Sequence, residues 1–146
     1  MSFLSDKTYK EIEYLLSLSK TPVGKILTTE YVTVESTDRV KEVISKIKKQ
    51  TQGFYTLSHI YVVNNEKELV GAFDLHELLL QKQETRVYRF MTQNLSLIYL
   101  TTPEIVVLRK IVKYKLNSLP VVDKDKHILG IVRFDDVIDS FLNTYE

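Results

Sequence analysis

The sequence predicts an α/β (α+β) fold in which two pseudo-symmetric β-α-β-β-α repeats pack into one module, preceded by an N-terminal helix. An apolar strand pattern centred on a glycine occurs twice, at Gly71 and at Gly130, with an offset of 59 residues. A second apolar strand pattern precedes each copy, at 59–64 and 118–123, and an acidic helix start follows each. An open solenoid needs at least three repeats to bury its faces, so two copies favour units that share one core. We therefore expect the functional site where the two copies meet.

Composition limits the classes of protein that fit this chain. Its 146 residues, 44% of them hydrophobic, can bury one sizeable core. The net charge of +1 provides no field for nucleic acid or anionic lipid. The absence of cysteine excludes disulfides and thiolate catalysis and fits a cytoplasmic location. The longest apolar runs have five residues, so we expect no direct membrane insertion by this segment.

The first half of the chain is expected to form an N-terminal helical segment, residues 1–21, followed by repeat 1, residues 22–84. Apolar residues at helical spacing predict the first helix from about 7 to 18. The Asn64-Asn65 pair suits a hairpin turn because asparagine tolerates left-handed conformations. The elements expected in repeat 1 are a turn at 23–27, a strand at 31–34, a helix at 38–49, strands at 60–63 and 69–73, and a helix at 75–81.

Repeat 2 is expected to cover residues 85–146. Thr102 is predicted to cap its first helix, with Pro103 as the first helical residue and the helix running to Tyr114. The side chains expected on the buried stripe of this helix are Ile105, Leu108, Ile111 and Val112. The remaining elements expected are a strand at 97–99, strands at 119–122 and 128–132 joined by a polar turn, and a final helix at 135–142.

Several phrases carry a resemblance to a known family over residues 22 to 142. In the first copy they are 26–32, Tyr61-Val62-Val63 and Leu69-Val70-Gly71, and in the second Phe90-Met91-Thr92, 119–123 and 130–138. The sequence resembles a tandem pair of CBS domains, a Bateman module, and is most similar to the cytosolic CBS region of MgtE-type magnesium transporters.

This resemblance implies a regulatory module rather than an enzyme. Such modules usually form homodimers, bind adenine nucleotides (ATP, ADP or AMP) or Mg²⁺ in the clefts between repeats, and transmit occupancy to an attached domain. Here that partner would be a covalently linked membrane transport domain, so the segment would be a cytosolic part of an inner or plasma membrane transporter. The abrupt end at 143–146 is expected to reflect excision from a longer chain.

The family's adenosine site implies candidate nucleotide ligands in the second copy. Its phrase is Gly-h-h-Thr/Ser-x-x-Asp, in which the carboxylate accepts hydrogen bonds from the ribose and the hydroxyl reaches the phosphate. The second copy has Gly130 and Asp136 at the matching positions but Arg133 at the hydroxyl position, where a cation could attract phosphate. Tyr31 is placed to stack on adenine. The alternative is that Asp136 caps the last helix and Tyr31 fills the core.

The first copy departs further from the family phrase. It has Gly71, but Asp74 occupies the hydroxyl position and Glu77 the acid position. Asp74 would repel phosphate. The resemblance therefore favours the second-copy cleft for nucleotide and counts against the first.

Magnesium requires hard oxygen ligands, which here would come from Glu84, Asp135 and Asp139. The family has an acid-rich segment between its repeats, whereas this chain has Lys82-Gln83-Glu84 and Arg89 at those positions. Two expected acids are thus replaced by bases. The alternative is that the remaining carboxylates are solvated surface groups.

The sequence offers no catalytic constellation, and we expect no enzyme. The three histidines are scattered over different elements, and the four glycines form neither a phosphate loop nor a nucleophile elbow. The alternatives to a ligand sensor are a structural homodimerisation module without a small-molecule ligand and a CBS regulator attached to another protein. Homodimerisation is expected through the helices, with 135–142 as the favoured contact.

Overall fold

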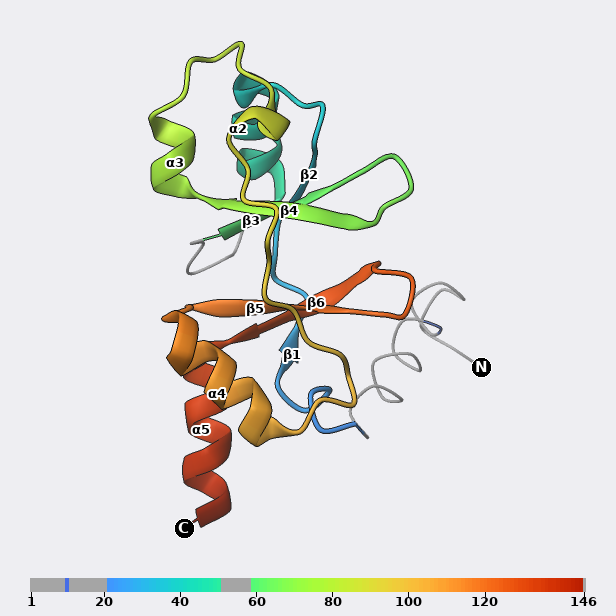
Figure 1. Cartoon of the computed structure of the whole chain (residues 1–146), viewed down its shortest axis with the longest axis vertical. Helices are drawn as coiled ribbons and strands as arrows, with labels where there is room; N and C mark the ends of the chain where they lie inside the picture. The colour runs from blue at the N-terminus through green and yellow to red at the C-terminus, as the bar shows by residue number, and fades with distance from the viewer. Residues whose placement is uncertain (1–9, 11–20, 51–58, 146) are drawn as a thin grey trace, which may run out of the picture.

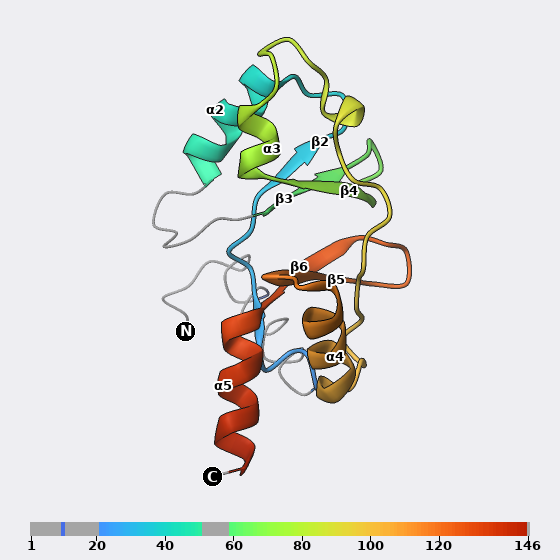
Figure 2. The ribbon, with the colours of Figure 1, turned by 60° about the vertical axis from the view of Figure 1, so that its left-hand side comes forward.

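Two small three-stranded sheets face each other in the computed structural model, and helices cover their outer faces (Figures 1 and 2). The structure describes Lys10, residues 21–50 and residues 59–145. The helix expected at 7–18 lies outside the described residues apart from Lys10, which is helical. The mixed α+β class is confirmed. Among the described residues, none of the helices combines the length and the apolar character needed to cross a membrane.

The first sheet is built from strands of repeat 1. β2 (Thr33–Glu35) runs parallel to β3 (His59–Val63), which pairs antiparallel with β4 (Leu69–Asp74). Helices α2 (Val40–Gln50) and α3 (Leu75–Leu79) lie on its outer side (Figure 1). α3 ends two residues earlier than the sequence predicts.

The second sheet combines strands from both halves of the chain. β5 (Ser118–Val122) pairs with β6 (Ile128–Arg133), and β6 also pairs with β1 (Leu27–Thr28), which lies near the start of repeat 1. The outer helices are α4 (Glu104–Tyr114) and α5 (Phe134–Tyr145), and a short 3-10 helix, η1 (Val87–Arg89), follows the first repeat. The strand expected at 97–99 does not form, since only Ile98 makes a bridge, to Val121.

Each glycine of the repeat allows a segment from the other half of the chain to approach closely. A Cβ added at Gly130 would lie 2.7 Å from Thr28 O in β1, and one at Gly71 would lie 3.1 Å from Thr92 O. Thr92 makes a bridge with Ala72 of β4, as β1 does with β6. The first segment of each repeat thus lies against the sheet of the other repeat, which ties the two halves into one molecule.

The core has one apolar cluster under each sheet and a third between the sheets. The third is made by Tyr61, Leu69 and Ala72 from the first sheet with Val122 and Ile131 from the second. Burial of apolar surface between two sheets opposes their separation. The repeats therefore share a core, as the pairing of two copies predicts.

The hairpin turns differ from the expectation for Asn64-Asn65. The residues with left-handed backbone are Lys67 and its counterpart Lys126, each with φ 66°. The Asn64 side chain instead organises the turn, because its Oδ1 accepts from the N–H of Glu66 (2.9 Å) and of Glu68 (3.0 Å).

The start of α4 also differs from the expectation. Pro103 is the cap and Thr102 Oγ1 accepts from the N–H of Tyr99 at 2.9 Å, so Thr102 closes the preceding turn rather than the helix. Ile105 and Val112 are exposed, whereas Ile111 is buried and Leu108 packs against the core as predicted, and Val107 is an additional buried residue. The helix packs through a narrower stripe because only one of its sides faces the sheet.

Candidate ligand cleft between the two sheets

A cavity of about 160 Å³ lies between the sheets at the end of β4. Its lining comes from β3 and β4 with α3, from segment 92–96 after η1, and from residues 116–120 around the start of β5. Both repeats therefore contribute. Sites that enclose drug-sized ligands measure about 300–1,000 Å³, so this cavity has room for a base or a nucleoside, and larger substituents of a ligand would extend outside it.

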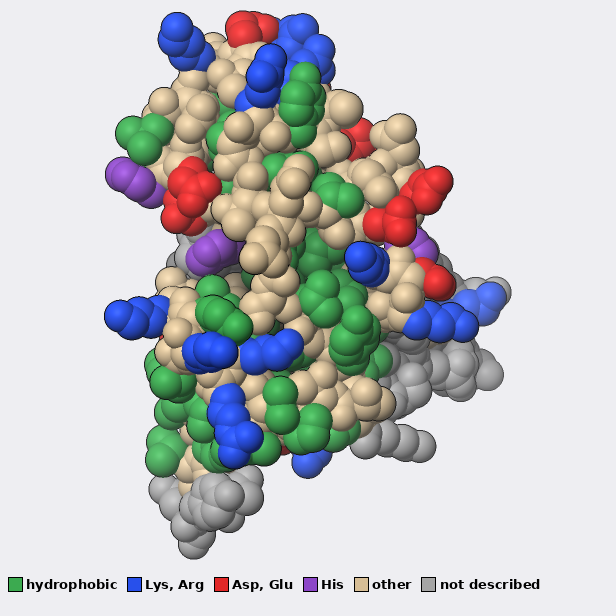
Figure 3. Space-filling view, in the orientation of Figure 1, with side chains coloured by type: hydrophobic (Ala, Val, Ile, Leu, Met, Phe, Trp, Pro, Cys, Tyr) green, Lys and Arg blue, Asp and Glu red, His purple; other side chains and the backbone are tan. Residues whose placement is uncertain are grey.

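Two carboxylates lie at one side of the cavity. Asp74 ends β4 and caps α3, since its Oδ1 accepts from the N–H of Glu77 at 2.7 Å. Glu77 lines the cavity one turn further on. Burial and the charge of Asp74 raise the pKa of Glu77 above its ordinary value. Figure 3 shows acidic and histidine side chains gathered beside α3, whereas basic side chains gather over α4.

His59 faces the same cavity from the neighbouring strand. It is the register partner of Asp74 across β3 and β4. Burial lowers the pKa of His59, and the opposing charge of Asp74 does not cancel this effect. The imidazole is therefore neutral at pH 7, and the cavity holds no compensating cation from this residue.

Tyr61 and Ser118 join the two sheets beside the cavity. Their hydroxyl oxygens are 2.8 Å apart and both residues are buried. Burial, only partly offset by the bond to Ser118, raises the pKa of Tyr61 to about 12. The pair is thus a neutral hydrogen bond across the inter-sheet core.

The second-copy residues predicted for nucleotide lie elsewhere. Arg133 donates from its Nη2 to Glu30 Oε2 at 3.0 Å and to Glu30 O at 3.3 Å. Gly130 is covered by β1, and Tyr31 packs against the inter-sheet cluster. The cation that was expected to attract phosphate is therefore paired with a carboxylate of the chain itself.

Asp136 lies in the first turn of α5, two residues inside the helix, and so does not form its cap. It lines a second, more open cavity of about 580 Å³ together with Asp139 and Glu104. Ser140 donates to Glu104 Oε2 at 3.2 Å at the same place. These carboxylates are oxygen donors of the kind that Mg²⁺ takes.

The three predicted metal residues are not brought together. Asp135 and Asp139 are exposed on α5, at one end of the molecule, whereas Glu84 lies in the loop after α3 at the other end (Figure 1). Glu84 pairs with Arg39 and Lys41, each at 3.0 Å. The hydrogen bond from Lys41 is the main reason that the pKa of Glu84 is lowered.

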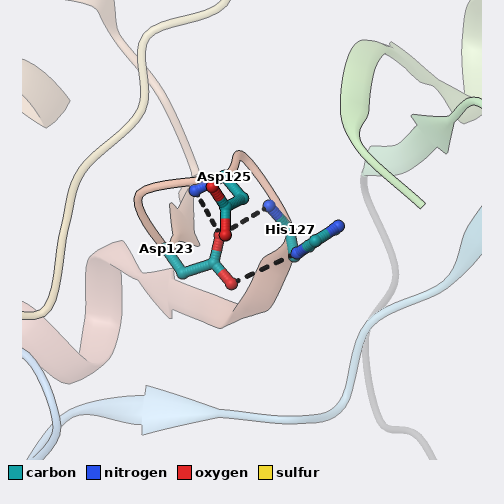
Figure 4. A group of neighbouring side chains, drawn as sticks. All are labelled: Asp123, Asp125 and His127. Atoms are coloured by element: carbon teal, nitrogen blue, oxygen red, sulfur yellow. Dashed lines mark hydrogen bonds and ion pairs between the residues drawn. The ribbon is translucent and has the colours of Figure 1, made fainter. Parts of the chain in front are cut away.

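The structure also brings together a group that the sequence analysis did not single out. Asp123, Asp125 and His127 in the turn between β5 and β6 place their ligand atoms within 4.8 Å of one another (Figure 4). Asp123 Oδ1 already accepts from the N–H of Asp125 (2.8 Å) and of His127 (2.9 Å). The alternation of acid and base in 123–127 was the signal available in the sequence. The group is explained by the turn that it stabilises, as at Asn64.

Two segments match the family model for the CBS domain, residues 23–83 and 87–143. The chain belongs to the CBS-domain family. The magnesium transporter MgtE of Thermus thermophilus is 32% identical to this CBS pair over 136 residues, which is 93% of this chain and 30% of the transporter. The chain therefore spans less than a third of the curated transporters that it matches.

Solved structures agree with this assignment. The soluble part of a magnesium transporter matches the CBS pair with a TM-score of 0.89 and 29% identity, over 98% of this chain and 56% of that chain. The cytosolic domain of the Mg²⁺ channel MgtE in complex with ATP matches with a TM-score of 0.86 and 31% identity, over 94% of this chain and 55% of that chain.

Proposed function

We propose that this CBS pair is the cytosolic regulatory module of an MgtE-like magnesium transporter, that it binds an adenine nucleoside or nucleotide and Mg²⁺, and that occupancy gates an attached transport domain. The observation that carries the proposal is the cavity between the sheets, to which both repeats contribute in a chain that is similar to an ATP-bound MgtE domain. A ligand held there contacts both repeats at once. Binding therefore biases their relative position.

The adenine ligand is assigned to the first-copy cavity. Its walls supply apolar contact through Phe73, Leu95 and Pro120, and Glu77 offers a carboxylate to ribose hydroxyls. The second-copy group of Tyr31, Gly130, Arg133 and Asp136 is the competing site. It would bind phosphate only if the pair between Arg133 and Glu30 opened.

Magnesium is assigned to the acidic cavity beside α5. Asp136, Asp139 and Glu104 contribute carboxylates from two helices, and exposed Asp135 adds charge at the start of α5. A cation between α4 and α5 would reduce the repulsion among these groups. Glu84 could join a metal site only through another part of the assembly, because in this chain it lies at the opposite end.

Thermal unfolding with adenosine, AMP, ADP, ATP and Mg²⁺ tests the proposal. A ligand at a hundredfold excess over its Kd stabilises the fold by about 2.7 kcal/mol. Glu77→Gln should reduce the shift with adenine compounds, and the double variant Asp136→Asn/Asp139→Asn should reduce the shift with Mg²⁺. Glu66→Gln, an exposed charge change in the β3–β4 turn, is the matched control.

A structural homodimerisation module is the alternative, and one observation favours it. Large aliphatic side chains are exposed on or beside three helices, including Leu79 on α3 and Leu80 at its C-terminal cap, Val112 on α4 and Leu142 on α5. Exposed apolar surface of this kind marks protein interfaces. Unfolding curves that do not move with any nucleotide or with Mg²⁺ would support this alternative over the ligand sensor.

A further inference from the structure

We propose that the cavity between the sheets selects an adenine nucleoside that lacks a 5′-phosphate, neutral or positively charged at that position, and that Asp74 is the residue that sets this preference. The inference rests on the proposed function, since it specifies the ligand of the same cavity. It follows from the charges that line the cavity.

The charged side chains described in the lining of the cavity are acidic. Among the described residues that line it, Asp74 and Glu77 are carboxylates, His59 is the sole histidine, and none is Lys or Arg. A 5′-phosphate would enter this negative field without a cation to pair with. Two like charges that come close together in a partly buried site repel each other more strongly than two opposite charges on the surface attract each other, because water screens the surface pair.

The Asp74 carboxylate is held in place by the fold. Its Oδ1 accepts from the N–H of Glu77 at 2.7 Å as the cap of α3, while β4 fixes its backbone against His59. Rotating it away to admit an anion would break this capping hydrogen bond. The repulsion is therefore a fixed property of the folded cavity, because the carboxylate that causes it cannot move away freely.

The rest of the lining suits an uncharged nucleoside. Phe73, Leu95, Leu116 and Pro120 provide apolar surface for a base. Glu77 and the hydroxyl of Ser118 provide partners for polar hydrogens. A positively charged 5′ substituent that reached Asp74 would be attracted by its carboxylate.

A basic groove next to the cavity makes ATP a more demanding test of the inference than AMP. The groove shares residues 94–96 and Leu116 with the cavity and carries Arg109, Lys110 and Lys113. Lys110 donates to Leu97 O at 2.8 Å, and Lys113 lies 5.3 Å from the ring centroid of Tyr114. A triphosphate that extended into this groove could find cations that AMP cannot reach.

Isothermal titration of the protein with adenosine, 5′-methylthioadenosine, S-adenosylmethionine, AMP and ATP tests the inference. We expect the first three to bind wild type at least about tenfold more tightly than AMP or ATP. Asp74→Ser keeps a good helix cap and removes the charge, so it should tighten AMP by at least about tenfold while leaving adenosine nearly unchanged. Asp74→Asn is the second variant should Asp74→Ser fail to fold, and Glu66→Gln is the control for net charge.

The outcomes separate this inference from the function on which it rests. Wild type that binds AMP or ATP as tightly as adenosine overturns the inference and leaves the nucleotide-sensing function intact. An AMP affinity that is the same in wild type, Asp74→Ser and Asp74→Asn also overturns the assignment to Asp74. Failure of every adenine compound to bind wild type and both variants overturns the proposed function and the inference together.

Discussion

Burial holds the pKa of His59 below its ordinary 6.5, so this residue makes stability depend on pH. Between the lowered pKa and 6.5 the unfolded chain binds more protons than the folded protein, and the free energy of unfolding therefore rises with pH across that window. As pH falls below 6.5, the free energy of unfolding of wild type should decrease, and that of His59→Gln should decrease by less. Urea denaturation of both proteins at about pH 5 and about pH 7.5 measures the difference. A stability gap that is the same at both pH values would contradict the prediction. Glu77, whose raised pKa has the opposite sign, is present in both proteins and cancels in the comparison.

Tyr61 and Ser118 provide a second prediction at the scale of single residues. Tyr61→Phe leaves the buried Ser118 hydroxyl without this partner, and we expect a loss of about 1–3 kcal/mol in the free energy of unfolding. Ser118→Ala should cost a comparable amount. The double variant should cost clearly less than the two losses added together, because one bond is broken in all three proteins. Additive losses in chemical denaturation would show that the two hydroxyls do not act as a pair.

At the scale of elements, the two glycines of the repeat are equivalent in sequence but not in their surroundings. A Cβ at Gly130 would lie 2.7 Å from the backbone oxygen of Thr28, whereas the nearest atom to a Cβ at Gly71 is the flexible Met91 Sδ, also at 2.7 Å. We expect Gly130→Ala to destabilise by about 1–3 kcal/mol and Gly71→Ala by less, because a methionine side chain can move and a paired strand cannot. Urea denaturation compares the two variants directly. An equal or larger loss for Gly71→Ala would count against the close contact of β1 with β6.

At the scale of the whole molecule, the exposed aliphatic side chains on α3 and α5 predict a homodimer. Leu80 is 70% exposed and Leu142 is 57% exposed, which is unfavourable for an isolated monomer. Light scattering at tens of micromolar should give twice the chain mass of 17.1 kDa. Leu80→Glu and Leu142→Glu should shift the mass towards the monomer, whereas Tyr99→Glu, an exposed site in the turn before α4, should not. A monomer mass for wild type would refute the homodimer.

Local patterns in the sequence were sufficient to predict most elements of the two repeats. The strands around Gly71 and Gly130 were expected to within one residue and the helices that follow them to within three, because alternation and helical periodicity depend on neighbouring residues. The same repetition indicated the family and placed the candidate ligand cleft between the copies. The sequence also shows Asp74 and Glu77 at the positions after Gly71 that the family phrase uses, but there they counted as evidence against nucleotide binding in the first copy.

Only the tertiary structure decided what these residues contact. The pairing of β1 with β6 and the bond between Glu30 and Arg133 join residues about a hundred positions apart, and no local pattern indicates which of two similar sheets a short strand will reach. The bond to Glu30 pairs the cation that the second copy offers, and a described cavity lies beside Asp74 of the first copy. The sequence by itself determined that there are two similar repeats with related phrases after Gly71 and Gly130. Long-range packing and ion pairing decided which of these residues line a cavity and which pair with each other, because both depend on side chains that come together only when the chain is folded.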